Sequence, residues 1–447
     1  MSRRHNPRLV VESLLKAVSG IGLAALAAAC GRVTSQSIPT TSAAPTQDTP
    51  TAYVSPLPDT PLPSHTPWLP TPTVTPAPIP TPLAKLTGGA QLEIRWIEML
   101  DDSTGWGIGG VKEGTDHILI TSDGAATWKD VSPMEPWDPE TAKSAIGAFL
   151  DSSHAWVIYS SLDPFVQIRQ TTIWRTQNAG LTWEASQPLD ISGLDIFIPK
   201  YTGFASASDG WLMIDLGGGM MHEYIALYTT HDAGRGWTRV LDPFGTAPVQ
   251  GCDKTGVTFF DSRTGWMTRD CHGVVEGLTL ESTLDGGSTW ISLPLPTPTF
   301  VAGAFDYPNF CWVHSPQLFS DYVGALAVSC QQFDEARAGS DDPWSNKRSY
   351  LYRTEDGGGS WTISAYPGGE LRFLSPEQIL AVGRTISIST NAGVDWRTVK
   401  TVAWDGQFSF VDLTHAWAVA RSGDALALVQ TTSGGRTWQE LHPVIQP

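Results

Sequence analysis

Seven versions of an eight-residue pattern, S/T-x-D-x-G-x-T/S-W, occur between Thr121 and Trp438. Its spacing predicts a tight β-turn, in which a side-chain oxygen at the third position accepts hydrogen bonds from backbone N–H groups. The fifth position is glycine in six copies, as expected where the backbone needs a positive φ, and Ala125 is the exception. The final tryptophan begins the next strand with a large apolar ring. The third positions are Asp123, Asn178, Asp232, Asp285, Asp356, Asn391 and Ser433.

A second pattern precedes most copies: an apolar stretch, a short polar turn, then tryptophan and another apolar strand, as in 101–110 and 411–420. Each repeat therefore predicts four short strands: A before the polar turn, B after it, C leading into the eight-residue pattern, and D starting at its tryptophan. The final tryptophans are 35 to 71 residues apart. Units of this size are typical of propeller blades. We predict an all-β, seven-bladed β-propeller over residues 86–447, in which a strand shared between the termini is not required.

The eight-residue pattern resembles the Asp box of sialidases and related propellers, and we use that name for it. A Gly-Trp segment similar to GW(x)VG, such as GWGIGG at 105–110, followed by a version of T-x-D-G-G-x-T-W, resembles the family of the photosystem II assembly and stability factor, over Gly88–Pro447. The first resemblance implies that Asp boxes lie at the blade periphery and are structural. The second implies a chaperone-like scaffold that binds an assembly partner without catalysis. That family's implied partner site is a cluster of arginines, and this acidic sequence shows no such cluster.

Residues 1–29 have the character of an export signal, because a basic start is followed by the apolar, small-residue run Val18–Ala29. The segment 26–30, LAAAC, is similar to a bacterial lipobox, in which the cysteine, here Cys30, is diacylated after cleavage. Ala27 stands where leucine is usual, and a signal peptide with a bystander cysteine is the alternative. We expect an exported protein anchored by lipid on the outer side of the bacterial cytoplasmic membrane, in the periplasm or at the cell surface.

Residues 30–85 are rich in Pro, Thr and Ser and nearly free of charge. Such a segment cannot bury a core, so we predict a disordered stalk between the anchor and the propeller. The formal net charge of the whole chain is −17. This charge argues against nucleic acid as a partner and against direct binding to an anionic membrane, and leaves the lipid as the expected membrane contact.

Four further cysteines, Cys252, Cys271, Cys311 and Cys330, would lie in an oxidising compartment. Three pairings are possible. Strands A and B are antiparallel neighbours, so the start of A lies beside the end of B, and this geometry favours Cys252–Cys271 and Cys311–Cys330. The alternative, a four-thiolate metal site, lacks any C-x-x-C spacing.

Strand alternation places all D–A and B–C connections on one face, and the long connections are all of these two kinds. Loops on a rigid scaffold are the usual place for recognition, so we expect the binding site on this long-loop face. The alternative is that these loops are decorative and their rings pack on the core. The candidate binding residues are Trp137, Phe165, Met221, His222, Phe244, Tyr307 and Trp344.

No protease, phosphate-loop or nucleophile motif is present, and no catalytic residue, metal or cofactor is predicted. We expect a monomeric, non-catalytic scaffold for a protein or glycan partner. The alternative is a carbohydrate-active hydrolase or lyase that uses acidic residues of the long-loop face, since glycosidases need two facing carboxylates. Each candidate carboxylate is more simply explained as a solvated loop charge. These candidates are Asp138, Glu140, Asp215, Glu223, Asp253 and Glu276.

Overall fold

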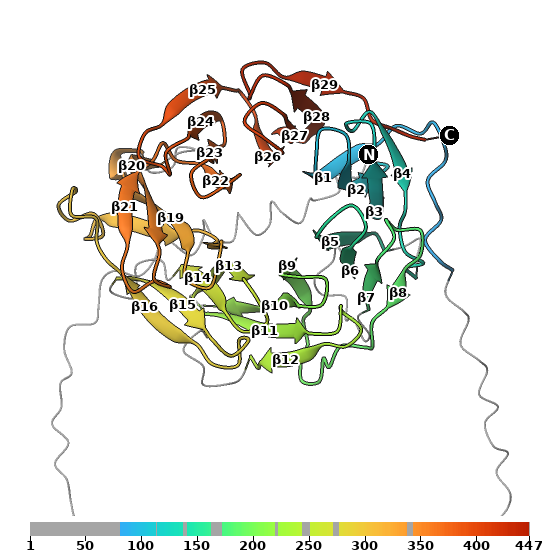
Figure 1. The fold of residues 1–447 in the computed structure, drawn as a ribbon, viewed down its shortest axis with the longest axis horizontal. Coiled ribbons are helices and arrows are strands. Elements are labelled where there is room, and N and C mark those ends of the chain that lie inside the picture. The colour runs from blue at the N-terminus through green and yellow to red at the C-terminus, as the bar shows by residue number, and fades with distance from the viewer. Residues whose placement is uncertain are drawn as a thin grey trace, which may run out of the picture. The chain divides into compact units, whose positions relative to one another are not determined.

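The computed structural model describes seven antiparallel sheets that follow one another around a ring (Figure 1). In each sheet the strands pair in the order A, B, C, D. The A strands lie around the centre of the ring and the D strands at its rim. The predicted all-β, seven-bladed propeller is confirmed. The described residues are 81–112, 114–136, 141–161, 172–219, 222–243, 251–270, 277–337 and 343–446.

Blades 1 to 4 have the predicted four strands each. Blade 1 consists of β1 (Glu93–Met99), β2 (Gly105–Gly110), β3 (His117–Thr121) and β4 (Thr127–Asp130). Blade 2 consists of β5 (Lys143–Phe149), β6 (Ala155–Ser161), β7 (Ile173–Thr176) and β8 (Glu184–Ala185). Blade 3 consists of β9 (Ile198–Phe204), β10 (Gly210–Gly219), β11 (His222–Thr230) and β12 (Thr238–Leu241). Blade 4 consists of β13 (Asp253–Phe259), β14 (Gly265–Asp270), β15 (Leu278–Thr283) and β16 (Ile291–Leu295).

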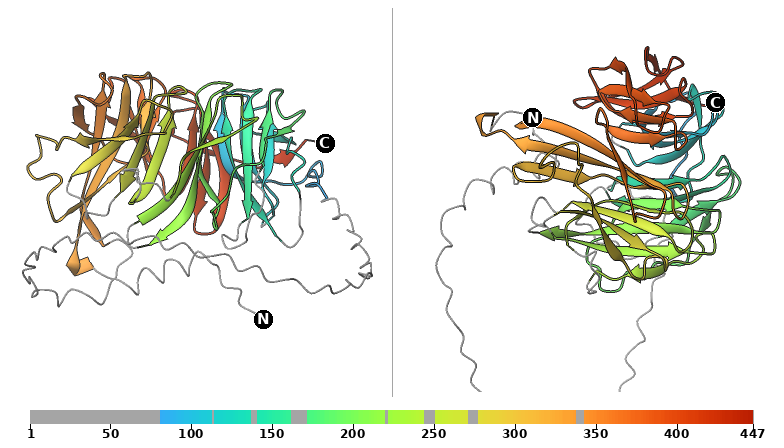
Figure 2. Two further views of the ribbon diagram at one scale, coloured as in Figure 1. Left: turned by 90° about the horizontal axis from the view of Figure 1, so that it is seen from below. Right: turned by 60° about the vertical axis from the view of Figure 1, so that its left-hand side comes forward.

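Blade 5 departs from this plan, because its A strand is split into two pieces that both pair with strand B. Its B–C hairpin is long, and Figure 2 shows it, in gold and orange, extending past the neighbouring blades. Blade 5 consists of β17 (Asn309–Val313), β18 (Gln317–Leu318), β19 (Gly324–Phe333), the 3-10 turn η1 (Glu335–Arg337), β20 (Trp344–Thr354) and β21 (Thr362–Ala365).

No helix among the described residues is long and apolar enough to cross a membrane.

Blades 6 and 7 return to the regular plan of four strands. Blade 6 consists of β22 (Glu370–Phe373), β23 (Ile379–Val382), β24 (Thr385–Ser389) and β25 (Arg397–Thr401). Blade 7 consists of β26 (Asp405–Phe410), β27 (Ala416–Ser422), β28 (Ala425–Thr431) and β29 (Gln439–Leu441).

The Asp boxes form the turns between strands C and D. In blade 4, Asp285 Oδ1 accepts hydrogen bonds from Thr283 Oγ1 and from the backbone N–H of Thr289, both at 2.9 Å. The fifth position has a positive φ in all seven boxes, including Ala125 at 73°. The fourth position is also left-handed, even where it is alanine, as at Ala179 with a φ of 58°. The sequence pattern signals only the fifth position, because glycine is not required at the fourth.

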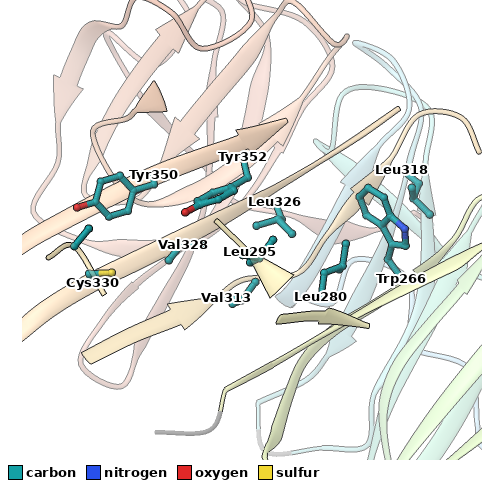
Figure 3. Close-up of a cluster of buried hydrophobic side chains, with 11 residues drawn as sticks. Trp266, Leu280, Leu295, Val313, Leu318, Leu326, Val328, Cys330, Tyr350 and Tyr352 are labelled. Atoms are coloured by element: carbon teal, nitrogen blue, oxygen red, sulfur yellow. The ribbon is translucent and has the colours of Figure 1, made fainter. Parts of the chain in front are cut away.

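The hydrophobic core lies between neighbouring blades. Figure 3 shows one such layer, in which Trp266 and Leu280 of blade 4 pack with Leu326, Val328 and Tyr352 of blade 5. All five side chains are almost fully buried. Face-to-face packing of this kind makes each blade depend on the next, so the ring must close between its first and last blades.

A short strand, β30 (Val444–Ile445), closes the ring by pairing in parallel with β4 at the outer edge of blade 1. The backbone N–H of Gln446 donates to the Trp128 carbonyl at 2.8 Å, and that of Gly89 donates to the Ile445 carbonyl at 2.9 Å. Each blade has its own four strands, as predicted, and the C-terminal segment adds a fifth to blade 1. This strand ties the last blade to the first.

Candidate binding site on the long-loop face

An aromatic cluster stands at the long-loop end of blade 5. The Trp344 ring lies edge-on to three others, with centroid distances of 5.6 Å to Phe310, 5.8 Å to Trp312 and 5.6 Å to Phe333. Tyr307 packs against Phe310 at 6.4 Å and is 88% exposed. Edge-to-face contacts of this type hold rings in fixed positions. The cluster therefore presents a rigid, partly exposed apolar surface.

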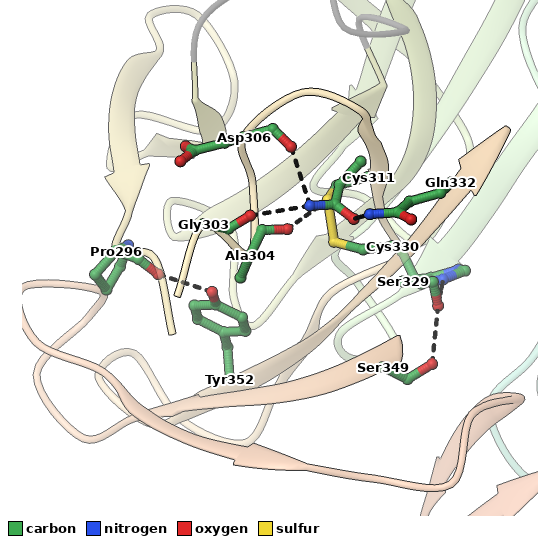
Figure 4. Close-up of a disulfide and its surroundings, with 12 residues drawn as sticks. Pro296, Gly303, Ala304, Asp306, Cys311, Ser329, Cys330, Gln332, Ser349 and Tyr352 are labelled. Carbon is green, nitrogen blue, oxygen red and sulfur yellow. Dashed lines mark hydrogen bonds between the residues drawn. A yellow bond between two sulfur atoms is a disulfide. The ribbon is translucent and has the colours of Figure 1, made fainter. Parts of the chain in front are cut away.

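A disulfide between Cys311 and Cys330 cross-links β17 and β19 next to this cluster (Figure 4). The two residues are directly opposite each other in the strand register, with a Cα–Cα distance of 4.0 Å. The predicted pairing of Cys311 with Cys330 is confirmed. Cys271 lies outside the described residues, so its pairing with Cys252 stays a prediction.

The connection that carries Tyr307 is fastened to the same place. The side-chain amide of Asn309 donates to the carbonyls of Gly303, at 2.9 Å, and Asp306, at 3.0 Å. Its Oδ1 accepts a hydrogen bond of 3.1 Å from Gln332 Nε2 in β19. These bonds and the disulfide fix the D–A connection against the B strand of blade 5.

A cleft of about 610 Å³ lies between blades 5 and 6 on the same face. Three basic side chains line it: Lys347 and Arg348 from β20 and Arg384 from the B–C turn of blade 6. None of the described residues that line the cleft is acidic. Arg384 forms a two-pronged ion pair with Asp405, with Nε–Oδ1 and Nη2–Oδ2 distances of 2.9 and 2.8 Å, but both side chains are mostly exposed.

Neutral polar groups, Ser329, Ser349 and Tyr350, also line the cleft, and His314 lies beside Ser329. Ser329 Oγ lies 2.8 Å from His314 Nε2 and 3.5 Å from Ser349 Oγ. Burial lowers the pKa of His314, which keeps this imidazole neutral at pH 7. The Tyr350 hydroxyl is buried and lacks a hydrogen-bond partner in the described structure. Among the described residues that line the cleft, the charged ones are therefore the three basic residues.

The structure brings together only some of the predicted binding residues. Tyr307 and Trp344 belong to one aromatic cluster through Phe310. His222 begins β11 in blade 3 and forms a β-bridge with Cys252, so it belongs to a different part of the face. Outside the described residues lie Trp137, Phe165, Met221 and Phe244.

Sequence reasoning missed the basic residues of the cleft. The absence of an arginine cluster in the sequence was misleading, because Arg348 and Arg384 are far apart in the chain but line the same cleft. The available signal was their position in the repeat. Arg348 lies near the start of the C strand of blade 5, and Arg384 directly precedes the C strand of blade 6. Equivalent positions of consecutive blades are neighbours in a propeller.

The described carboxylate candidates are engaged inside blades 3 and 4. Glu223 is buried, forms an ion pair with Lys200 and accepts a hydrogen bond from the backbone N–H of Lys254. Asp215 accepts a bond of 2.7 Å from the backbone N–H of Gly217. No group of three or more His, Cys, Asp or Glu side chains among the described residues could hold a metal ion. Outside the described residues lie Asp138, Glu140 and Glu276.

Several solved structures are similar to this chain in fold. YCF48 bound to D1 peptide matches with a TM-score of 0.47 and 12% identity, over 79% of this chain and 100% of that one. YCF48 from Cyanidioschyzon merolae matches with a TM-score of 0.41 and 13% identity, over 77% of this chain and 96% of that one. The GH74 enzyme of Niastella koreensis matches with a TM-score of 0.36 and 13% identity, over 79% of this chain and 62% of that one.

These similarities concern the fold alone. The seven-bladed propeller that the motif resemblance implies is confirmed by the structure itself. A scan against protein-family models and a search of curated proteins gave no match.

Proposed function

We propose that this propeller is a non-catalytic scaffold that captures a protein partner by an acidic segment, which binds in the cleft between blades 5 and 6. One observation carries the proposal. Three basic side chains of a chain with net charge −17 gather at one cleft whose described lining has no carboxylate. Such a site attracts an acidic ligand, and none of the described lining groups repels that ligand.

The chemistry of the cleft suits carboxylates in an extended peptide. An arginine guanidinium can bind a carboxylate through two parallel hydrogen bonds. Arg384 already makes this contact with Asp405, but an exposed pair contributes only about 0–1 kcal/mol. A carboxylate of the partner can therefore take the place of Asp405 at little cost. The neighbouring aromatic cluster offers the apolar area that hot spots of protein interfaces use.

Charge reversal tests this function. The probe is a fluorescently labelled oligoglutamate peptide. The test protein is a double variant that combines Arg348→Glu and Arg384→Glu. Arg436→Glu, an exposed residue of the blade 7 Asp box, is the matched control. We expect the double variant to bind at least about tenfold more weakly, the control to bind normally, and added salt to weaken wild-type binding. Equal binding by the double variant and the wild type would sink the proposal.

The site of action is part of the same proposal. The lipobox-like LAAAC segment supports an exported protein anchored by lipid at Cys30 and held away from the membrane by the stalk of residues 30–85. Cys30→Ser should release the mature protein into the soluble exported fraction, because acylation needs the thiol. If the variant remains membrane-bound after a carbonate wash to the same extent as the wild type, the anchor is elsewhere.

A carbohydrate-active hydrolase or lyase on the long-loop face is the second candidate. The exposed rings of the aromatic cluster favour it, because sugars stack on such surfaces, but the described lining of the cleft offers no pair of carboxylates. Release of reducing ends from oligosaccharides by the wild type, abolished by changing one acidic residue of this face, would favour the enzyme over the scaffold.

A further inference from the structure

The A strands of the propeller surround two adjoining cavities at the centre of the ring, with volumes of about 670 and 280 Å³. The same four residues line both cavities: Trp96 and Glu98 from β1, Gln317 from β18 and Arg372 from β22. They come from blades 1, 5 and 6. This central site is distinct from the cleft between blades 5 and 6, with which it shares no lining residue.

The polar groups of this site are not satisfied by one another. Within the described residues, the side chains of Glu98 and Gln317 make no hydrogen bond, and Glu98 makes no ion pair with Arg372. Arg372 Nη2 lies 2.9 Å from Glu370 Oε1, while its Nε is buried and without a partner. A carboxyl, an amide and a guanidinium thus face the same cavities with unused hydrogen-bonding capacity, which is costly unless a ligand or solvent uses it.

The site also has an aromatic wall and little net charge. Trp96 is half-buried and stacks with Phe149, with ring centroids 5.1 Å apart. Lys200 lines the larger cavity, but Glu223 pairs with its ammonium group. Glu370 likewise pairs with the guanidinium group of Arg372. An ion of either sign would therefore gain little in this site.

We propose that this central site binds a neutral saccharide. Sugar hydroxyls both donate and accept hydrogen bonds, which matches the mixture of acceptor and donor groups on Glu98, Gln317 and Arg372. The apolar face of a sugar ring can pack on the indole of Trp96. The larger cavity has the volume of a typical small-molecule site.

Glu98 is suited to this role at neutral pH. Burial raises the pKa of its carboxyl to about 7, although the positive charge of Arg372 opposes the shift. The group can therefore donate as well as accept a hydrogen bond to a hydroxyl. Glutamine keeps both capacities, whereas alanine removes them.

The proposal can be tested with the purified propeller on an array of defined oligosaccharides, followed by titration of each hit monitored by tryptophan fluorescence. We expect the wild type to bind at least one neutral class. Gln317→Ala and Glu98→Ala should weaken that binding by about tenfold or more, and Glu98→Gln should change it by less than about threefold. The Gln317 side chain is exposed and makes no hydrogen bond within the described residues, so Gln317→Ala should fold normally.

Two outcomes would overturn the inference: no neutral glycan bound by the wild type, or wild-type affinity in both alanine variants. The variant Arg348→Glu with Arg384→Glu separates this site from the cleft. It should lose the acidic peptide and keep the saccharide, so the two proposals can fail independently.

Discussion

The indole nitrogen of Trp417, in strand B of blade 7, donates a hydrogen bond of 2.9 Å to the carbonyl oxygen of Gly124, in the Asp box of blade 1. The equivalent indole of blade 2, Trp156, donates to the Ala233 carbonyl in the Asp box of blade 3 at 2.8 Å. The same contact therefore joins neighbouring blades, and at Trp417 it joins the last blade to the first. The Asp boxes contribute to cohesion of the ring as well as to their own turns.

Trp417→Phe should destabilise the propeller by removing this contact. The substitution keeps an aromatic ring but leaves the Gly124 carbonyl without its donor. Trp211→Phe is the matched control, because Trp211 has the equivalent position in blade 3 but its Nε1 is buried without a partner. Both variants lose the same volume, so the difference between their free energies of unfolding isolates the hydrogen bond. We expect Trp417→Phe to cost about 1–2 kcal/mol more in urea denaturation. An equal loss would contradict this role.

The repeat pattern predicted the fold well because it encodes local structure that recurs. A turn with an Asp, a Gly and a Trp at fixed positions defines where strands C and D meet, and seven copies define seven blades. The closing strand at Val444–Ile445 was not predictable in this way, because two residues carry no periodic signal. It forms only because the ring brings its partner strand alongside.

The cleft between blades 5 and 6 and the central site were less predictable, since each is built by residues from different blades. The lengths of the loops predicted Tyr307 and Trp344 as binding residues, and these two do lie in one cluster. The central residues Glu98 and Arg372 lie within short strands, where charged residues look like ordinary solvent-facing positions. Only the closed ring reveals that these positions face a shared channel.

Asp285→Ala should lower the stability of blade 4 without changing binding of the acidic peptide. The carboxylate accepts bonds from the backbone N–H and the hydroxyl of Thr289, at 2.9 and 2.6 Å, and its loss should cost about 1–2 kcal/mol. Asp285→Asn is the matched control, because Asn178 and Asn391 occupy the same position in blades 2 and 6 and keep the bond to the turn N–H. Thermal denaturation of the three proteins measures the effect. Unchanged stability with lost binding would place function in the Asp boxes.

Loss of the Cys311–Cys330 disulfide should loosen blade 5 before the ring unfolds. The bridge closes a loop with a sequence separation of 19 residues, for which chain entropy predicts a contribution of about 3 kcal/mol. Hydrogen exchange of the Cys311→Ser, Cys330→Ser variant should increase first in β17, β19 and the aromatic cluster around Trp344. Uniform exchange throughout the propeller would contradict local loosening. Peptide mapping of the unreduced protein should also recover Cys252 joined to Cys271, and any other partner for Cys252 would refute that pairing.

Glu98→Gln should stabilise the propeller at alkaline pH and have little effect at acid pH. Burial raises the pKa of Glu98 from 4.5 to about 7, so the folded state binds this proton more tightly than the unfolded state does. Its stability is therefore highest below about pH 4.5 and falls as the pH rises to about 7, above which the loss is complete. Glutamine cannot ionise and avoids this loss.

The free energy of unfolding of Glu98→Gln minus that of the wild type should therefore be small near pH 4.5. It should grow through neutral pH and level off at up to about 3 kcal/mol above pH 8. Urea denaturation at several pH values measures this difference, and the value at pH 4.5 serves as the internal control, because both side chains are then uncharged in the folded protein. A difference that is constant with pH would show that Glu98 remains solvated as an ordinary carboxylate. In that case its unused hydrogen-bonding capacity could not support the proposed saccharide site.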